Sequence, residues 1–299
     1  MKKEKLMMMA AALFALAGCD NEETGNWAGE IRLGSNLAVQ QVDTRAATGI
    51  QNDAFAIGEN LDVYINEDVQ KGQTPSTTYP QPLVYTTGSG GALSTATQPY
   101  FPSSGNGVNI YAVYPKDVAE TFTVQTDQST DAAYKASDLM HGLPQSGNPV
   151  ARTKDKVNIQ FRHLLSKVTI KLVAGTGSPD LDGATVKLKS LKPSTTLTKA
   201  DGSITEATGN ATDITVMNSG MSGSAVVIPQ TAASANFVEV TLKSGGTLLG
   251  KLDDGSTPQF KGGHEFKYDI TVNLTGLNIT GSIQPWTPNN TQQGNAEMQ

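Results

Sequence analysis

Cys19 is the residue whose neighbours most clearly predict a covalent reaction, and it is the only cysteine in the 299-residue chain. Leu16, Ala17 and Gly18 precede it, which is the lipobox pattern of a bacterial lipoprotein signal peptide. The small residues let the chain enter the signal peptidase, and the Cys19 thiol then takes a diacylglycerol. The alternative is an ordinary secretory signal with a chance cysteine, which would leave a free thiol on an exported protein.

The elements around this cysteine agree with export. Three lysines within the first five residues form a basic start, and residues 6–17 form an apolar core that is too short to span a membrane. We therefore expect residues 1–18 to be a lipoprotein signal peptide. The acidic run at residues 20–23 is either a solvated tether or a signal for export to the cell surface.

No comparable pattern predicts catalysis or metal binding. His141, His163 and His264 lie far apart in the chain and lack a cysteine or carboxylate partner at metal-ligand spacing. His163 is expected to pack or to form a hydrogen bond rather than to act as a base. No G-x-S-x-G nucleophile motif, H-E-x-x-H zinc motif or phosphate-binding loop occurs. We therefore expect no enzyme activity and no catalytic, cofactor-binding or metal-binding residue.

Composition and charge restrict the class of protein. Charged residues make up 17% of the chain and aromatic residues 6%, and the net charge is −6. Such a chain, rich in Gly, Ser, Thr and Asn, suits short strands joined by polar turns. It also lacks the basic surface that binding to nucleic acid requires. The sequence contains no run of about 18 or more uncharged apolar residues, so we expect no membrane-spanning helix.

Alternating apolar and polar residues predict strands along the whole chain. The expected strands lie at residues 31–41, 61–65, 108–113, 121–124, 157–161, 164–172, 184–189, 214–216, 225–228, 238–242, 266–274 and 277–283. Asp201-Gly202 and Asp253-Asp254-Gly255 are expected to form hairpin turns. No sustained helical period occurs, so the expected fold class is all-β. The number of strands favours two β-sandwich domains, at residues 46–160 and 161–286, before a polar tail at residues 287–299.

The first expected strand has a single apolar face. That face consists of Ile31, Leu33, Leu37 and Val39. A small polar run that contains Arg45 follows, and we hypothesise that the strand is temporary: the chain is cut after Arg45 and another subunit fills the groove. Four aliphatic side chains at about 1.5–3 kcal/mol each amount to about 6–12 kcal/mol of lost burial. That loss is comparable to the whole stability of a domain, about 5–15 kcal/mol, so a cut subunit should take up a replacement strand.

Several short stretches, taken in order, resemble the fimbrillin family of Bacteroidales, the major- and minor-fimbria subunits that assemble as type V pili. The matching stretches are Leu16–Cys19, Thr44-Arg45-Ala46, Ser137-Asp138-Leu139-Met140, Phe161–Ile170, Val227-Ile228-Pro229-Gln230 and Gly263–Trp286. Each is short, and it is their order along nearly the whole chain that makes the resemblance specific.

This resemblance implies a fold and a course of assembly. The fold would be two tandem transthyretin-like β-sandwich domains after the signal peptide. The chain would be exported as a prepilin, anchored at the outer membrane through the lipid on Cys19, and cut between Arg45 and Ala46 by an arginine-specific protease. Loss of the propeptide 19–45 would release the strand Ile31–Gln41, and the groove would accept a strand from another pilus subunit. The product would be a fimbrium on the cell surface that serves adhesion.

The strand to be donated is expected at residues 276–286, where Leu277, Ile279 and Ile283 lie on one face. The alternative is that this segment stays as the last strand of its own domain. The chain would then be a tip or accessory subunit that accepts a strand without giving one, since the polar tail that follows is not an obvious donor. A third possibility is an anchor subunit that keeps its lipid and is never cut at Arg45.

A further alternative is a surface lipoprotein that binds glycans and never polymerises, because sugars stack on aromatic side chains. Trp27, in the leader, and Trp286, at the end of the last strand, are not placed like a stacking platform. The remaining candidates near expected loops are Tyr79, Tyr85, Tyr100 and Tyr114. Packing at strand ends and turns is the other interpretation of these tyrosines.

Overall fold

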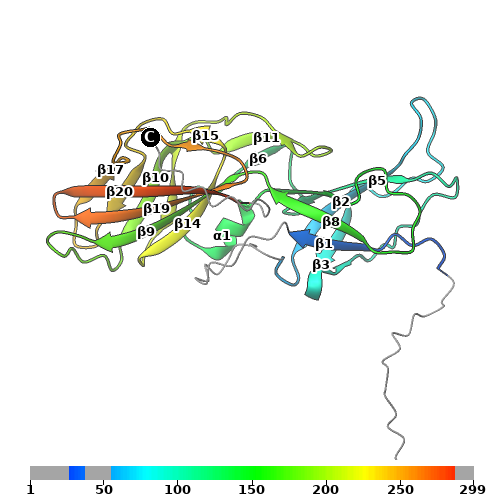
Figure 1. The fold of residues 1–299 in the computed structure, drawn as a ribbon, viewed down its shortest axis with the longest axis horizontal. Helices are drawn as coiled ribbons and strands as arrows, with labels where there is room; N and C mark the ends of the chain where they lie inside the picture. The colour runs from blue at the N-terminus through cyan, green and yellow to red at the C-terminus, as the bar shows by residue number, and fades with distance from the viewer. Residues whose placement is uncertain (1–26, 38–54, 287–299) are drawn as a thin grey trace, which may run out of the picture.

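The computed structural model describes residues 27–37 and 55–286, which form twenty β-strands, one 3-10 turn and one short α-helix along an elongated molecule (Figure 1). The expected predominance of β-structure is confirmed, and the strands form several sheets. Buried hydrophobic residues gather in two cores, one in each half of the molecule. The described part of the chain contains no helix that is long and apolar enough to cross a membrane.

A seven-stranded sheet forms the N-terminal half. In order across the sheet, the strands are β1 (Leu33–Leu37), β8 (Val157–His163), β7 (Met140–Pro144), β5 (Val108–Tyr114), β2 (Asn60–Glu67), β3 (Leu83–Thr87) and β4 (Leu93–Ser94). Buried side chains alternate with more exposed ones along β3 and β8, and one face of the sheet covers a core containing Val63, Ile110 and Ile159. Neighbouring strands are antiparallel except β1 and β8, which run parallel.

The two ends of this sheet come together. Gly34 of β1 forms an antiparallel bridge with Ala92, beside β4. The 3-10 turn η1 (Ser89–Gly91) lies against Ser35, and the Ser35 hydroxyl donates to the Gly91 carbonyl at 3.3 Å. Gly91 has a φ of +74°, and a Cβ at this position would collide with the Ser35 carbonyl, so only glycine permits the approach. Strand β1 thus closes the sheet on itself.

Two four-stranded sheets pack face to face in the C-terminal half (Figure 1). One consists of β13 (Thr212–Met217), β10 (Thr185–Leu191), β16 (Val238–Thr241) and β17 (Thr247–Gly250). The other consists of β14 (Ser222–Val227), β9 (Ser166–Ala174), β19 (His264–Asn273) and β20 (Gly276–Pro285). Ile170 from one sheet and Val186 from the other are fully buried in the core between them.

Two smaller sheets complete the fold, and the one that contains β6 joins segments that are far apart in the sequence. Strand β6 (Thr121–Thr123) precedes β7 in sequence but pairs with β11 (Ser194–Thr198), which in turn pairs with β12 (Ser203–Ile204). Strands β15 (Gln230–Thr231) and β18 (Gln259–Phe260) form a two-stranded sheet. Phe122 and Leu139 belong to the C-terminal core. Residue 160, the expected boundary, lies inside β8, and the division into domains 46–160 and 161–286 stays a prediction.

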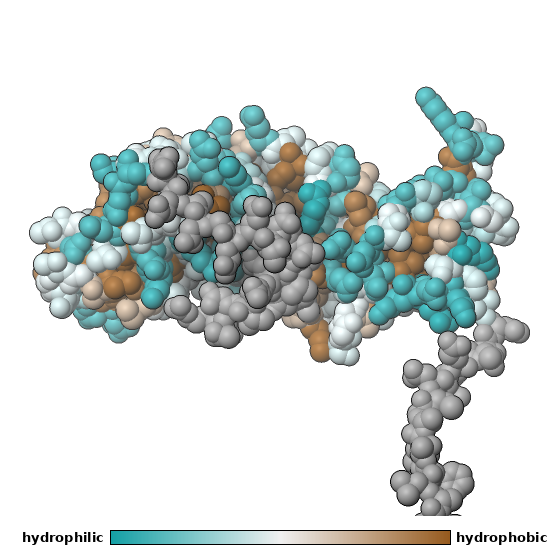
Figure 2. Space-filling model, viewed as in Figure 1, coloured by the Kyte–Doolittle hydropathy of each residue, from teal (hydrophilic) through white to brown (hydrophobic). Residues whose placement is uncertain are grey.

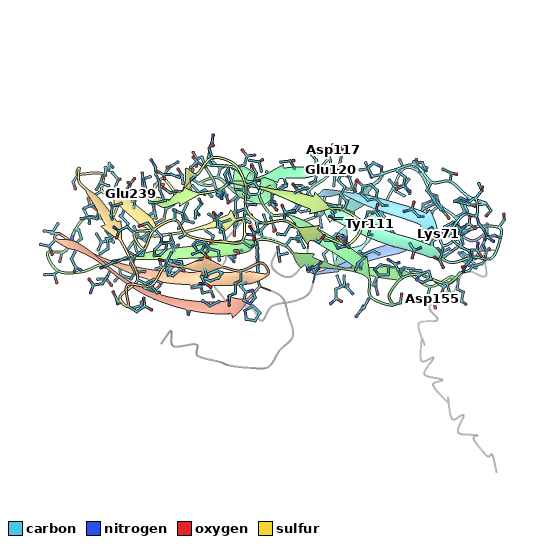
Figure 3. The ribbon with its side chains drawn as sticks, turned by 90° about the horizontal axis from the view of Figure 1, so that it is seen from above. Lys71, Tyr111, Asp117, Glu120, Asp155 and Glu239 are labelled. Carbon is cyan, nitrogen blue, oxygen red and sulfur yellow. The ribbon has the colours of Figure 1, made fainter. Side chains whose placement is uncertain are left out.

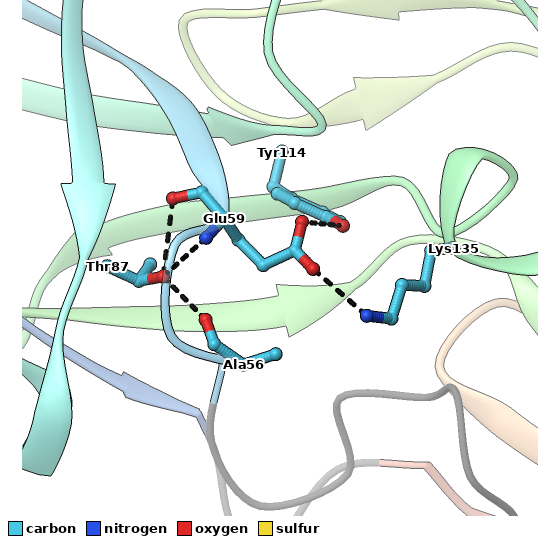
Figure 4. A network of polar contacts seen from close by, with 5 residues as sticks. All are labelled: Ala56, Glu59, Thr87, Tyr114 and Lys135. Atoms are coloured by element: carbon cyan, nitrogen blue, oxygen red, sulfur yellow. Dashed lines mark hydrogen bonds and ion pairs between the residues drawn. The ribbon is translucent and has the colours of Figure 1, made fainter. Parts of the chain in front are cut away.

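The single α-helix of the described residues, α1 (Asp131–Ala136), connects the halves as well. The Thr130 hydroxyl caps it by accepting a hydrogen bond from the Ala133 backbone at 3.3 Å. In its last turn, Lys135 pairs with Glu59 at 3.0 Å, and the other Glu59 oxygen accepts a bond from Tyr114 at 3.2 Å (Figure 4). Both ions are partly exposed, so this pair contributes little to the stability of the fold.

The two Asp-Gly turns differ in what they connect. Gly202 has a φ of +69° and lies between β11 and β12, which are paired, so Asp201-Gly202 is the expected hairpin turn. Gly255 also has a positive φ, of +71°. It lies between β17 and β18, which are not paired with each other, so Asp253-Asp254-Gly255 forms a turn but not the hairpin that was expected.

The β11–β12 hairpin reaches from the C-terminal half onto β7. His141 Nε2 lies 3.0 Å from the Lys199 carbonyl, and Arg162 Nη2 donates to the Gly202 carbonyl at 3.4 Å. Gly202 packs so closely on the His141 ring that a Cβ would not fit. Burial, opposed by the Lys199 carbonyl and aided by the Arg162 charge, lowers the pKa of His141 to about 4.

We predict a stability change below neutral pH that depends on His141. The unfolded chain binds a proton near the ordinary pKa of 6.5, whereas the folded chain does so only near pH 4. The free energy of unfolding should therefore fall as the pH drops from about 6.5 to about 4, by up to about 3 kcal/mol from this group.

Urea unfolding of the His141→Gln variant at a series of pH values tests this prediction. The variant should lose that part of the pH dependence, while His264→Gln, which leaves His141 in place, should keep it. An unchanged slope in His141→Gln would contradict the assignment.

Candidate functional site

Strand β1 and the groove that holds it form the candidate functional site. In Figure 1, β1 is the dark blue arrow beside β8. Its parallel register places Leu33 opposite Val157 and Leu37 opposite Phe161. The Val157 N–H also donates to the Arg32 carbonyl at 2.8 Å, so pairing begins before the strand proper.

The other side of this segment is also hydrogen-bonded. The Ile31 N–H donates to the Pro99 carbonyl at 2.9 Å, and the Phe101 N–H donates to the Gly29 carbonyl at 2.8 Å. The Gln98 amide donates to the Ile31 carbonyl at 2.9 Å. Residues 29–37 therefore lie as an inserted strand between β8 and the segment 91–101.

The side chains of the segment alternate between core and solvent. Ile31, Leu33 and Leu37 are at most 5% exposed and belong to the N-terminal core, whereas Arg32 and Asn36 are exposed. The expected one-sided apolar pattern is present over residues 31–37. The remaining residues of the expected mechanism, Cys19, Val39, Arg45 and Ala46, lie outside the described residues, as does the expected tail 287–299.

The expected donor segment lies inside its own half of the molecule. Strand β20 pairs with β19 along its whole length and forms the edge of its sheet. Ile279 is buried, and Leu277 and Ile283 are half-buried against the C-terminal core. The three side chains share one face, as the sequence pattern predicts, and β20 serves here as the last strand of the C-terminal half.

Trp286 fixes the end of β20 at the junction between the halves. Its indole is 2% exposed and stacks on His163, with ring centroids 3.7 Å apart. His163 Nδ1 in turn lies 2.7 Å from Asp138 Oδ1, and both residues are buried. His163 thus packs and hydrogen-bonds, as expected. Sequence analysis missed Asp138 as its partner, because 25 positions separate the two residues.

The aromatic candidates differ in exposure. Tyr79, Tyr85 and Tyr114 are buried, while Tyr100 is 46% exposed. Trp27 packs edge-on against Phe101, with Arg152 over its ring. Within residues 27–37 and 55–286, no three His, Cys, Asp or Glu side chains are grouped so that they could hold a metal ion.

The fold and the inserted segment define a class of protein: an elongated, mostly β chain whose N-terminal strand completes a sheet formed by later residues. Comparison with protein families agrees with this description, since the model of the fimbrillin-like family matches residues 44–286. The chain belongs to the fimbrillin-like family, which is a family of fimbrial structural proteins and not of enzymes.

Individual relatives extend the match over the whole chain. A candidate fimbrium subunit of Bacteroides uniformis, Fim1C, is 27% identical over 99% of this chain and 100% of its own length. Crystal structures of candidate cell adhesion proteins from Bacteroides uniformis and Bacteroides ovatus share the fold. They have TM-scores of 0.64 and 0.66 and identities of 22% and 19%, and each match covers 87% of this chain and 98% of the solved one.

We predict that a charge on the buried face of β1 destabilises the N-terminal half. Leu33→Asp removes a buried side chain worth about 1.5–3 kcal/mol and places a carboxylate in the core. The urea midpoint should fall by the equivalent of at least about 2 kcal/mol. Arg32→Asp, on the exposed face of the same segment, is the matched control and should stay within about 0.5 kcal/mol of the parent. Equal effects of the two variants would show that β1 is not seated as described.

Proposed function

We propose that this protein is a structural subunit of a surface pilus. It is exported as a prepilin lipidated on Cys19, cut after Arg45 by an arginine-specific protease, and polymerised by strand exchange into a fimbrium that serves adhesion. The observation that carries the proposal is the seating of β1, which has hydrogen-bonded neighbours on both sides and a buried apolar face. Membership of the fimbrillin-like family and the likeness to Fim1C support it.

The position of Arg45 gives the cut its effect. Arg45 lies in the sequence between β1 and β2, so cleavage after Arg45 leaves β1 attached only by non-covalent contacts. Departure of β1 uncovers the backbone of β8 and of residues 98–101 together with an apolar slot. Open strand edges of this kind pair readily with a strand from another chain. The family match begins at residue 44, just before the junction at which the chain would be cut.

Strand β20 is the proposed donor to a neighbouring subunit. It lies at a sheet edge, and five of its ten residues are exposed, so its release would cost less burial than the release of a central strand. The complete pairing of β20 with β19 and the buried Trp286 favour the second candidate: a tip or accessory subunit that accepts a strand without giving one. A separate candidate is an anchor subunit, which keeps its lipid and is never cut at Arg45, so that its groove stays filled by its own N-terminal strand.

We predict that Arg45 is required for assembly. Arg45→Ala should leave monomers in a gel of surface extracts under mild denaturation, where the parent gives a ladder. Arg32→Ala removes an arginine that lies within the seated segment and should leave the ladder intact. Sequencing of the assembled chain should give Ala46 as the first residue, and an assembled chain that starts at Cys19 would rule out strand removal.

We predict that a disulfide between β19 and β20 distinguishes a stalk subunit from a tip subunit. Thr271 and Asn278 lie directly opposite each other, so Thr271→Cys with Asn278→Cys should cross-link the two strands when oxidised. A stalk subunit locked in this way accepts a strand but gives none, so its fibres should shorten and reduction should restore them. Fibres of unchanged length in the oxidised form would identify β20 as a permanent strand and the chain as a tip or accessory subunit.

A further inference from the structure

A cavity of about 320 Å³ lies beside the groove of β1, between the loop that joins β2 to β3 and the segment that leads into β5. The residues that line it are Thr77, Thr78, Tyr79, Pro80, Leu83, Thr97, Gln98, Pro99, Tyr100, Phe101 and Ser103. Their side chains are hydroxyls, one amide, aromatic rings and aliphatic groups, and none of them is charged. On the face shown in Figure 2, hydrophobic residues lie in small groups among hydrophilic ones, with no broad apolar area.

The lining indicates the chemical class of a ligand. A charged ligand would have no opposite charge among the lining residues. A purely apolar ligand would exclude water from the threonine hydroxyls without offering them a hydrogen-bond partner. Rings and aliphatic groups mixed with hydroxyl and amide groups suit a neutral molecule that has an apolar face and a rim of hydroxyls. A neutral saccharide has both.

Tyr100 is placed to act as the stacking surface. Tyr100 lines the cavity and is 46% exposed, whereas the other two aromatic residues of the wall, Tyr79 and Phe101, are buried. The Tyr79 hydroxyl donates to the Tyr100 carbonyl at 2.7 Å and so holds the Tyr100 backbone. Burial, with a smaller effect of the Glu67 charge, raises the pKa of Tyr79 to about 12, which keeps this hydroxyl a donor.

The carboxylate of Glu67 holds the two sides of the cavity together. One oxygen accepts hydrogen bonds from the Ser76 hydroxyl and the Thr77 N–H, both at 2.9 Å. The other accepts bonds from the Ser104 hydroxyl at 2.6 Å and the Asn106 amide at 2.9 Å. Because Ser76 and Thr77 lie at the start of one wall and Ser104 directly follows the other, the Glu67 carboxylate joins the two walls before a ligand binds.

The wall that carries Tyr100 is also held from the groove. Gln98, Pro99 and Phe101 are the residues that hydrogen-bond to Gly29 and Ile31. The wall of the cavity is therefore ordered by the chain that occupies the groove.

We propose that this cavity binds a neutral saccharide whose ring stacks on Tyr100, and that the strand in the adjoining groove holds the wall of this site in its binding shape. The second half of this statement rests on the proposed function, since only an exchangeable strand makes the site respond to assembly. An occupied groove then gives full affinity, and an empty groove gives less.

The saccharide site is tested on the uncut chain carrying Arg45→Ala, which under the proposed function stays monomeric. It is applied to a printed array of neutral and acidic glycans, and the neutral glycans retained are confirmed by saturation-transfer NMR. We expect binding to neutral glycans, a loss of about tenfold in affinity in Tyr100→Ala, and retention in Tyr100→Phe. Tyr111→Ala is the control, because Tyr111, labelled in Figure 3, stacks on Tyr64 and is not among the residues that line the cavity.

Several outcomes would overturn the saccharide site: no glycan bound, binding to acidic glycans alone, or equal affinity in Tyr100→Ala. Because this chain is uncut, failure to bind is seen independently of any failure to polymerise. The role of the strand is tested in the same chain with Ile31→Ala, which should weaken glycan binding. Arg32→Ala should leave binding unchanged, and equal affinity in Ile31→Ala and Arg32→Ala would overturn the coupling between groove and cavity.

Discussion

The interaction on which the N-terminal half depends is the pairing of residues 29–37 with two backbone edges at once. Strand β8 and the segment 91–101 have backbone groups that face the same gap. Residues 29–37 lie in this gap and pair with the neighbour on each side. The same insertion buries Ile31, Leu33 and Leu37 in the core. The sheet is thus completed by an N-terminal segment that is distant in sequence from its partners, and the family to which the protein belongs is one of fimbrial structural proteins.

The two halves are joined by contacts of different chemical kinds. Lys135 reaches Glu59 through a partly exposed ion pair, the β11–β12 hairpin covers His141, and Trp286 stacks on His163 at the junction. Trp286 directly follows β20, so the last contact ties the end of this strand to the junction. If β20 is donated, the junction loses a buried indole, so the donor step would be coupled to the way in which the halves meet.

Strands with strict alternation were predictable because burial on one face imposes a period of two. This holds for β2, β5, β8, β9 and β19, where long aliphatic side chains mark the inward face. Sequence analysis did not identify β3, β7, β11 or β17. Strand β11 has the sequence Ser194-Thr195-Thr196-Leu197-Thr198, and β7 contains Gly142 and Pro144. Neither sequence has a clear apolar alternation, so these segments are strands because of the strands with which they pair. The helix α1 was missed because six residues are too few to establish a helical period.

By itself, the sequence determined the fold class, the one-sided strand at residues 31–37 and the absence of a catalytic motif, because these depend on local pattern and residue type. Only the tertiary structure decided the parallel pairing of β1 with β8, the placement of β20 inside its own half, and the cavity beside Tyr100. These features depend on contacts between residues far apart in the chain. Gln98 and Ile31 are separated by 67 positions, and His163 and Asp138 by 25. A local sequence pattern contains no information about which distant segment a residue will contact.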